Sequence, residues 1–121
     1  METDKSYNGW TNWETWHTAL LADNTESTEK QAVALGARCA DIRAGRVKGK
    51  VYDPGRAAAA YKRILAGCWR ETRTFARENA REFGGGWREP LGTVNWLEIA
   101  ESYMDEADLD RQYREGQEVR P

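Results

Sequence analysis

The sequence predicts an all-α fold, a small single-domain bundle of about four helices. Three observations support this: apolar residues recur at three-four spacing, helix-capping residues precede those stretches, and glycines follow them. The chain has 121 residues, enough for one modest hydrophobic core. Only 40% of the residues are hydrophobic, so that core has little apolar material to spare.

The first helix is expected over residues 12–23. Its apolar face has positions i, i+3, i+7 and i+8, which are Trp13, Trp16, Leu20 and Leu21. Thr11 and Glu14 have the spacing of a capping box, in which the hydroxyl accepts the Glu14 amide and the carboxylate accepts the Thr11 amide. Asn12 is the alternative cap and moves the start by one residue.

A second helix is expected over residues 28–44, capped by Ser27 or Thr28 and ended by Gly45. Its apolar stripe is Ala32, Leu35, Cys39 and Ile42. Residues 45–53 are rich in glycine and cations, which predicts a loop or a short β-hairpin.

A long helical pattern follows over residues 54–83, opened by Asp53 as the cap and Pro54 at the first helical position. A straight helix of this length would measure about 43 Å, which is large for this domain. Gly67 is the candidate position for a kink. The apolar positions are Tyr61, Ile64, Leu65, Cys68, Thr72, Phe75 and Phe83.

The last helix is expected over residues 96–106. Asn95 is its cap, Glu98 closes a second capping box, and Val94 has the position to form a hydrophobic staple with Ile99. The apolar face consists of Trp96, Ile99, Ala100 and Tyr103.

The domain is expected to span residues 1–107. Residues 108–121 are highly charged and have no sustained apolar stripe, which predicts a flexible C-terminal tail.

Three of the six tryptophans stand in the stretch GWTNWETW, residues 9–16. A buried indole removes on the order of 200 Å² from water, so Trp13 and Trp16 can supply much of a core that is poor in leucine and phenylalanine. Trp10 precedes the cap, where it can close over the start of the helix. We favour structural anchoring for all three over a role as an interface.

The stretches GWTNWETW and VNWLEIAE together resemble a group of small proteins encoded on phages, plasmids and other mobile elements. The resemblance covers residues 9–16 and 94–101, and Trp13 stands where those proteins have tyrosine. The resemblance implies that the gene belongs to a mobile element, and it therefore implies that the protein acts in the cytoplasm of a bacterial host. It does not imply a chemical reaction. The motif residues to which we assign a structural role are Trp10, Thr11, Asn12, Trp13, Glu14, Trp16, Asn95, Trp96 and Glu98.

Groups suited to catalysis or metal binding are scarce. Glu14 and His17 form a Glu-x-x-His pair, but di-iron bundles need two such pairs and the chain has one histidine. Cys39, Cys68 and His17 lack the short spacing of zinc ligands, and free buried thiols are expected at both cysteines. We therefore expect that the protein is not an enzyme and that it binds neither a cofactor nor a metal ion.

The net charge of −2 hides an uneven distribution. Residues 1–35 carry six acids and two bases, residues 36–90 carry thirteen bases and six acids, and residues 91–121 carry eight acids and three bases. Either the acidic ends pack against the basic middle, or the middle is a basic face for a polyanion. We favour the first. The sequence also shows neither a membrane span nor a secretory leader.

Two functions fit these observations. In the favoured one, the protein binds a host protein complex and inhibits it, for example a CRISPR effector or a restriction enzyme, because acidic surfaces can occupy sites built for phosphate. In the alternative, the basic segment 43–81 makes it a nucleic-acid-binding accessory protein. The candidate binding residues, for a protein partner or for nucleic acid, are Arg43, Arg46, Lys48, Lys50, Arg56, Arg70, Arg73 and Arg77. The sequence leaves the oligomeric state open.

Overall fold

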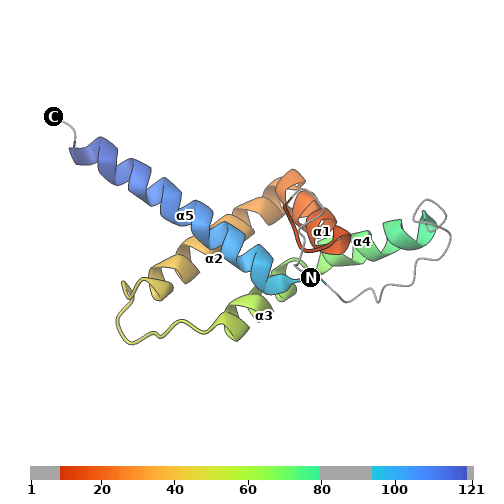
Figure 1. Cartoon of the computed structure of the whole chain (residues 1–121), viewed down its shortest axis with the longest axis horizontal. Helices are drawn as coiled ribbons and strands as arrows, with labels where there is room; N and C mark the ends of the chain where they lie inside the picture. The colour runs from red at the N-terminus through yellow and green to blue at the C-terminus, as the bar shows by residue number, and fades with distance from the viewer. Residues whose placement is uncertain (1–8, 80–93, 120–121) are drawn as a thin grey trace.

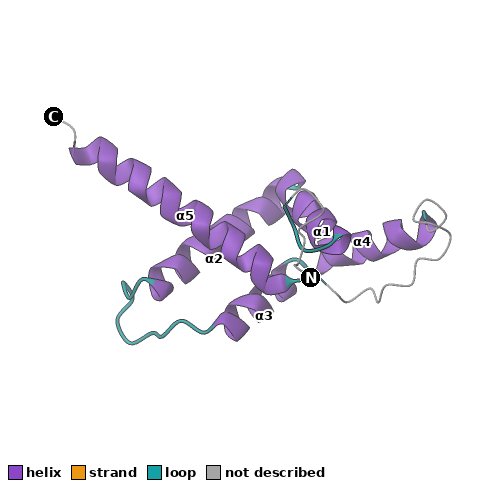
Figure 2. Ribbon diagram, in the orientation of Figure 1, coloured by secondary structure: helices purple, strands orange, loops and turns teal. Residues whose placement is uncertain are grey.

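Figure 1 shows the computed structural model of the chain, which describes residues 9–79 and 94–119. All regular structure in these residues is helical: α1 (Trp13–Asn24), α2 (Glu26–Arg43), α3 (Pro54–Ile64), α4 (Ala66–Glu78) and α5 (Trp96–Val119). The predicted all-α class is confirmed. Residues 45–53 contain no strand and form the long loop between α2 and α3 (Figure 2).

The pattern that predicts one helix over residues 54–83 forms two helices, divided at Leu65. The backbone of Leu65 leaves the helical region (φ −103°, ψ 16°), and its side chain is fully buried. The break therefore lies two residues before Gly67, the expected kink. It allows α3 to pack against α5 while α4 packs against α1. Residues 80–83 of the expected helix lie outside the described residues.

α1 and α2 are separated by Thr25 alone. The Thr25 hydroxyl donates to the Leu21 carbonyl (3.0 Å) and makes no capping bond to α2. α2 begins at Glu26, so the expected cap at Ser27 or Thr28 is wrong. Because only Thr25 stands between the two helices, Ser27 and Thr28 already lie inside α2 and cannot cap it.

The hydrophobic core lies mainly where α2, α3 and α5 meet. Tyr61 on α3 and Tyr103 on α5 stack with their ring centres 5.5 Å apart, and the Tyr61 hydroxyl donates to the Ala32 carbonyl on α2 (2.7 Å). Leu65, Ile99, Ala100 and Met104 are fully buried around this pair. Cys39 and Cys68 are buried free thiols, as predicted.

α2 and α5 cross at a close contact (Figure 1). A Cβ atom placed on Gly36 would lie 2.8 Å from the Cβ of Tyr103 and 2.9 Å from its backbone carbonyl carbon. Only glycine allows the two backbones to approach this closely. The neighbouring positions of α2 that face the core are also small, Ala32 and Ala40.

The buried face of α1 differs from the predicted one. Leu20 is 38% exposed and Trp16 is half-buried, while the buried positions are Trp13, Glu14, Thr15, Thr18, Ala19 and Ala22. The Thr15 hydroxyl oxygen accepts the Asn95 amide at the start of α5, and the Thr18 hydroxyl donates to Thr72 on α4. Because these polar groups have partners across the interface, they are buried in place of Leu20.

α5 continues far beyond residue 106, to Val119, so the segment 108–119, which the sequence predicts to be a flexible tail, is helical. Two i,i+4 ion pairs support this part of the helix: Arg114–Asp110 (2.8 Å) and Arg111–Glu115 (3.6 Å). The C-terminal part of α5 projects from the rest of the molecule (Figure 1).

Candidate functional site

The two sequence motifs meet in space, because the N-termini of α1 and α5 lie against each other. Each helix is capped by its own asparagine. The Thr15 amide donates to Asn12 Oδ1 (2.9 Å), and the Glu98 amide donates to Asn95 Oδ1 (3.0 Å). The recurring Asn-Trp pair therefore marks two equivalent helix starts.

The side chain three residues after each cap serves the other helix. Glu98 Oε1 accepts the Thr11 amide (3.0 Å), and Thr15 Oγ1 accepts the Asn95 amide (2.8 Å). In a capping box these acceptors would serve the caps of their own helices. The predicted boxes are thus wrong in their pairing: the Thr11 amide is bound by Glu98 and not by Glu14. The exchange ties together residues that are 80 and 87 positions apart in the sequence.

Trp13 stands at the contact between α1 and α4. It is 7% exposed and stacks on His17 and Phe75, with ring centres 4.7 and 5.9 Å away. The other motif tryptophans, Trp10, Trp16 and Trp96, are partly buried.

A buried hydroxyl links the same two helices. The Thr18 hydroxyl donates to Thr72 Oγ1 (3.0 Å), and Thr72 Oγ1 lies 3.0 Å from His17 Nδ1. With Thr18 as the donor, the Thr72 proton can point to Nδ1 of a neutral imidazole. Burial lowers the pKa of His17, and the charge of Glu71 opposes that shift in part. The lowered pKa favours the neutral form of the imidazole in this contact.

This arrangement predicts a pH-dependent stability. Because the pKa of His17 is lower in the folded chain, its contribution is complete above the ordinary histidine pKa of about 6.5 and is lost as the pH falls below it. Urea unfolding at pH 7.5 and pH 5.5 should show a loss of stability that is smaller in H17Q, which does not titrate. Equal pH dependence in the two proteins would contradict this prediction.

Three of the predicted binding residues form ion pairs, and two of them, Arg43 and Arg46, do so with α5. Arg43 donates to Asp105 (3.2 Å) and Asp108 (2.8 Å) on α5. Arg46 donates to Asp41 (2.8 Å) and lies 3.8 Å from Asp108. At these positions the basic middle of the sequence packs against the acidic C-terminal part.

The other predicted binding residues do not form one surface with them. Lys48 and Lys50 are exposed on the loop between α2 and α3, and Arg56 is exposed beside Asp53 at the start of α3. Arg70, Arg73 and Arg77 lie on α4, near the opposite end of the molecule (Figure 1). The Arg73 guanidinium lies over Trp69, 5.0 Å from the ring centre. The eight residues thus fall into separated groups.

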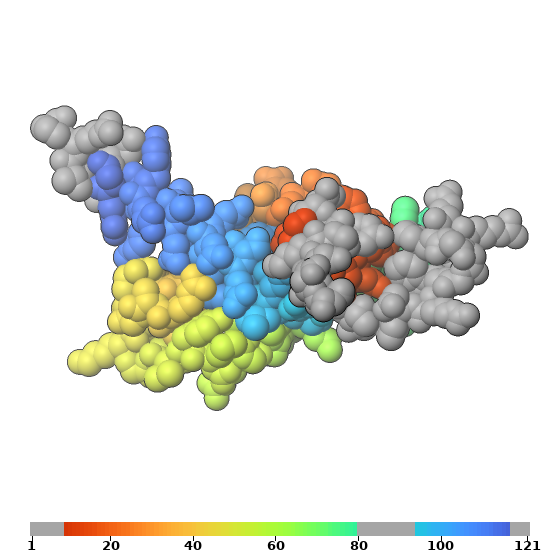
Figure 3. Space-filling model, viewed as in Figure 1, coloured from red at the N-terminus to blue at the C-terminus, as the bar shows by residue number. Residues whose placement is uncertain are grey.

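The sequence interpretation missed the surface of α5. This helix contains eight acidic and two basic residues. Leu109 and Tyr113 are 65% and 68% exposed. They belong to the C-terminal part of α5, which projects from the rest of the molecule in the space-filling view (Figure 3). Burial raises the pKa of Glu106, and the nearby charges of Asp23 and Glu29 raise it further. Negative charge is therefore concentrated where α5 passes the ends of α1 and α2.

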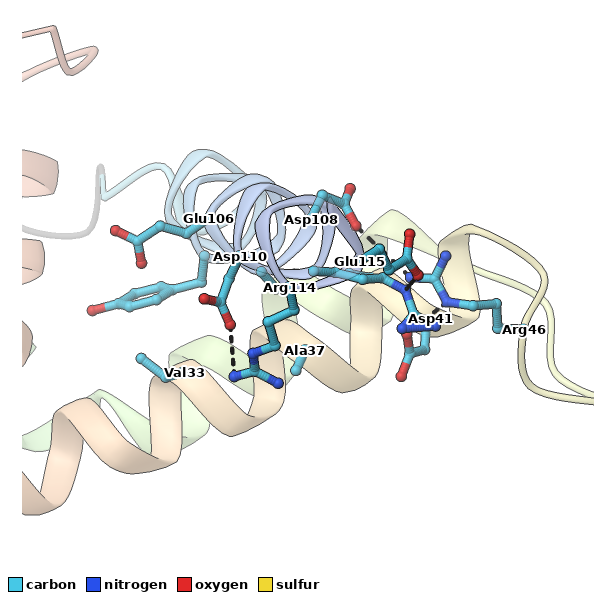
Figure 4. A pocket seen from close by; sticks show the side chains of 13 residues that line it. Val33, Ala37, Asp41, Arg46, Glu106, Asp108, Asp110, Arg114 and Glu115 are labelled. Carbon is cyan, nitrogen blue, oxygen red and sulfur yellow. Dashed lines mark hydrogen bonds and ion pairs between the residues drawn. The ribbon is translucent and has the colours of Figure 1, made fainter. Parts of the chain in front are cut away.

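Two hollows adjoin α5. One, of about 600 Å³, lies between α2 and the C-terminal part of α5 and is lined in part by small apolar side chains of α2, Val33 and Ala37 (Figure 4). The Arg114–Asp110 ion pair lies over it (Figure 4). The other, of about 480 Å³, runs along the solvent side of α5 from Trp10 to Leu109 and is lined by carboxylates.

Within residues 9–79 and 94–119, no three histidine, cysteine or carboxylate side chains are grouped as a metal would require. None of the helices in these two ranges has both the length and the apolar composition needed to cross a membrane.

Comparison with known proteins gives one match. Neither the curated proteins nor the solved structures contain a significant match to this chain. The sequence profile of a family of unknown function, DUF7249, matches residues 3–115, a span that includes both tryptophan motifs. The chain therefore belongs to the family of unknown function DUF7249.

Proposed function

We propose that this protein acts by binding another protein, without catalysing a reaction. Its target in this proposal is a nucleic-acid-handling defence complex of a bacterial host, such as a CRISPR effector or a restriction enzyme, which it inhibits. The observation that carries the proposal is the acidic helix α5, whose sequence has eight acidic and two basic residues and whose projecting part exposes two apolar side chains, Leu109 and Tyr113.

The electrostatics of α5 suit such a target. A helix of 24 residues is roughly 36 Å long, and most of its charged groups are negative. Sites that bind nucleic acid present arginine and lysine to phosphates. The carboxylates of α5 carry the same sign of charge as phosphates, so they attract such a site over long range and compete with the nucleic acid for it. Four of them are partly neutralised by arginines in ion pairs, so the exposed Glu101 and Glu106 are the main contributors.

The state of the basic residues supports this proposal over direct binding of nucleic acid through residues 43–81. Arg43 and Arg46 are ion-paired with aspartates, so phosphate contacts would have to displace these partners. The remaining candidate residues are divided among the loop between α2 and α3, the start of α3, and α4. A protein with a net charge of −2 also gains little from long-range attraction to DNA.

The resemblance of the two motifs to proteins of phages and plasmids gives this proposal its setting, the cytoplasm of a bacterial host. Mobile elements benefit when host defence is inhibited, and inhibition by occupation of a binding site needs no catalytic group and no cofactor.

A transformation assay tests the proposal. A panel of bacterial strains, each with one defined CRISPR effector or restriction enzyme, is transformed with a plasmid which that system attacks. Expression of the protein should raise the number of transformants at least tenfold in one or more strains, and an otherwise identical strain without the defence system is the control. No increase in any strain, together with sub-micromolar binding of the purified protein to duplex DNA at about 0.15 M salt, would overturn the proposal.

A further inference from the structure

We infer that the solvent side of α5 is a docking surface, and that its occupant is a basic segment of a partner protein which carries apolar anchor residues. This surface, the outer face of α5, consists of Glu101, Asp105, Glu106, Leu109 and Tyr113. The inference rests on the proposed function of protein binding, and it adds the position of the interface and the chemistry of the partner.

The outer face lies opposite the core side of α5. Ile99, Ala100, Tyr103 and Met104 are buried and hold the helix against α2 and α3. Leu109 and Tyr113 are four residues apart, so they lie on the same side of the helix, one above the other. Both are more than 60% exposed, which leaves them available to a partner.

The composition of this face is that of an interface. Interfaces bury aromatic and aliphatic anchors at their centre and keep charged groups at the rim. Here Leu109 and Tyr113 form the apolar centre. Exposed Glu101, Asp105 and Glu106 flank it on the side toward the body and line the same hollow as Leu109, and Asp105 is also paired with Arg43.

Charge complementarity identifies the occupant. Glu101, Asp105 and Glu106 line one hollow, so negative groups crowd this side of the helix. Burial raises the pKa of Glu106, and the nearby carboxylates of Asp23 and Glu29 raise it further. A lysine or arginine placed beside Glu106 would relieve that repulsion. A second copy of the chain would instead bring two sets of carboxylates together, which disfavours self-association through this face.

The length of the face sets the size of the occupant. From Glu101 to Tyr113 the helix rises by roughly 18 Å. A basic helix of three to four turns spans this distance, and leucines spaced by four residues on one side of it would meet Leu109 and Tyr113.

A peptide titration tests the inference. The probe is a labelled 15-residue peptide with two leucines four positions apart among lysines, and its matched control has serine in place of both leucines and the same charge. At about 0.15 M salt the leucine peptide should bind the full-length protein at least tenfold more tightly than the serine peptide. The variant L109S/Y113S should lose that difference, and E101Q/E106Q should weaken the binding of both peptides.

The control variant is V51S, which changes an exposed apolar residue on the loop between α2 and α3, outside the outer face of α5, and should bind like the wild-type chain. All four replaced side chains of the α5 variants are exposed, and helical circular dichroism verifies that both variants fold. Equal binding of the two peptides, or equal binding by L109S/Y113S and V51S, would overturn the inference. So would a dimer in sedimentation that L109S/Y113S dissociates, because the face would then bind a second copy.

This outcome is distinguishable from failure of the proposed function. If the wild-type protein protects plasmids and L109S/Y113S protects them equally, the docking surface is wrong while the function stands. If the peptides bind as expected but no strain is protected, the surface is correct and the class of target is wrong.

Discussion

Replacement of Trp13 by alanine is expected to lower the free energy of unfolding by about 3–5 kcal/mol. The indole is 7% exposed and stacks on His17 and Phe75, so its removal leaves a cavity between α1 and α4. A small domain has about 5–15 kcal/mol of stability in total. Urea unfolding followed by circular dichroism should therefore show a large shift to lower urea, or a chain that is mostly unfolded in buffer.

Trp16→Ala is the matched control, since it removes the same side chain one turn later in the same helix. Trp16 is only half-buried, so its loss should cost clearly less. The sequence pattern assigns Trp13, Trp16 and Trp96 equally to the core, whereas the structure separates the first from the other two. Equal destabilisation by the two replacements would contradict the burial described here.

Replacement of Gly36 by alanine is expected to destabilise the protein by about 2 kcal/mol, although alanine is the better helix former. The added methyl group would lie within 3 Å of Tyr103 backbone and side-chain atoms, which forces α2 and α5 apart. Thermal unfolding of the purified variant measures this cost.

Gly67→Ala provides a control of opposite sign. Gly67 also lies inside a helix, and a Cβ atom there meets nothing within 4 Å. Alanine at this position should stabilise the protein by up to about 1 kcal/mol, because it restricts the unfolded chain and favours the helix. If both variants are stabilised, the close crossing of α2 and α5 is not present in solution.

The sequence predicts the helix starts well where one residue controls them. Asn12, Asp53 and Asn95 each accept backbone amides of the helix that follows, as capping residues do. The partner of the Glu98 carboxylate could not be predicted in this way. Glu98 Oε1 accepts the backbone amide of Thr11, which is distant in the sequence. Local capping rules pair a side chain only with its own helix.

The division of the long helical pattern follows from packing and not from the glycine. The break falls at Leu65, whose buried side chain lies between the parts of the chain that contact α5 and α1. Gly67 has the weaker intrinsic propensity yet remains helical. Tertiary contacts therefore override local preference at this position.

Of the candidate site on α5, the sequence predicts only that the C-terminal part of the chain is acidic. The uneven distribution indicates that acidic and basic parts pack together, and Arg43 with Asp108 does so. The outer face of α5 could not be found by a search for apolar stripes, because Leu109 and Tyr113 stand alone among charged residues. Ion pairs hold that segment helical without a buried face.

The basic residues of segment 43–81 lie apart in the fold for a different reason. Residues 43–81 are continuous in sequence, but the chain folds back between α2 and α3 and breaks again at Leu65. Arg46 is thereby brought to α5 while Arg77 lies at the end of α4. A cluster of charge along a sequence becomes a surface only when the fold keeps its members together.

The central claim is that carboxylates of α5 occupy a phosphate-binding site, and displacement of nucleic acid tests it most directly. A labelled DNA or RNA substrate is bound to a purified effector that the transformation assay identifies, and its anisotropy is followed as the protein is added. The wild-type chain should release the substrate, and E101Q/E106Q should need at least tenfold more protein. Retention of the substrate while the protein is bound, or equal displacement by E101Q/E106Q, would contradict the claim.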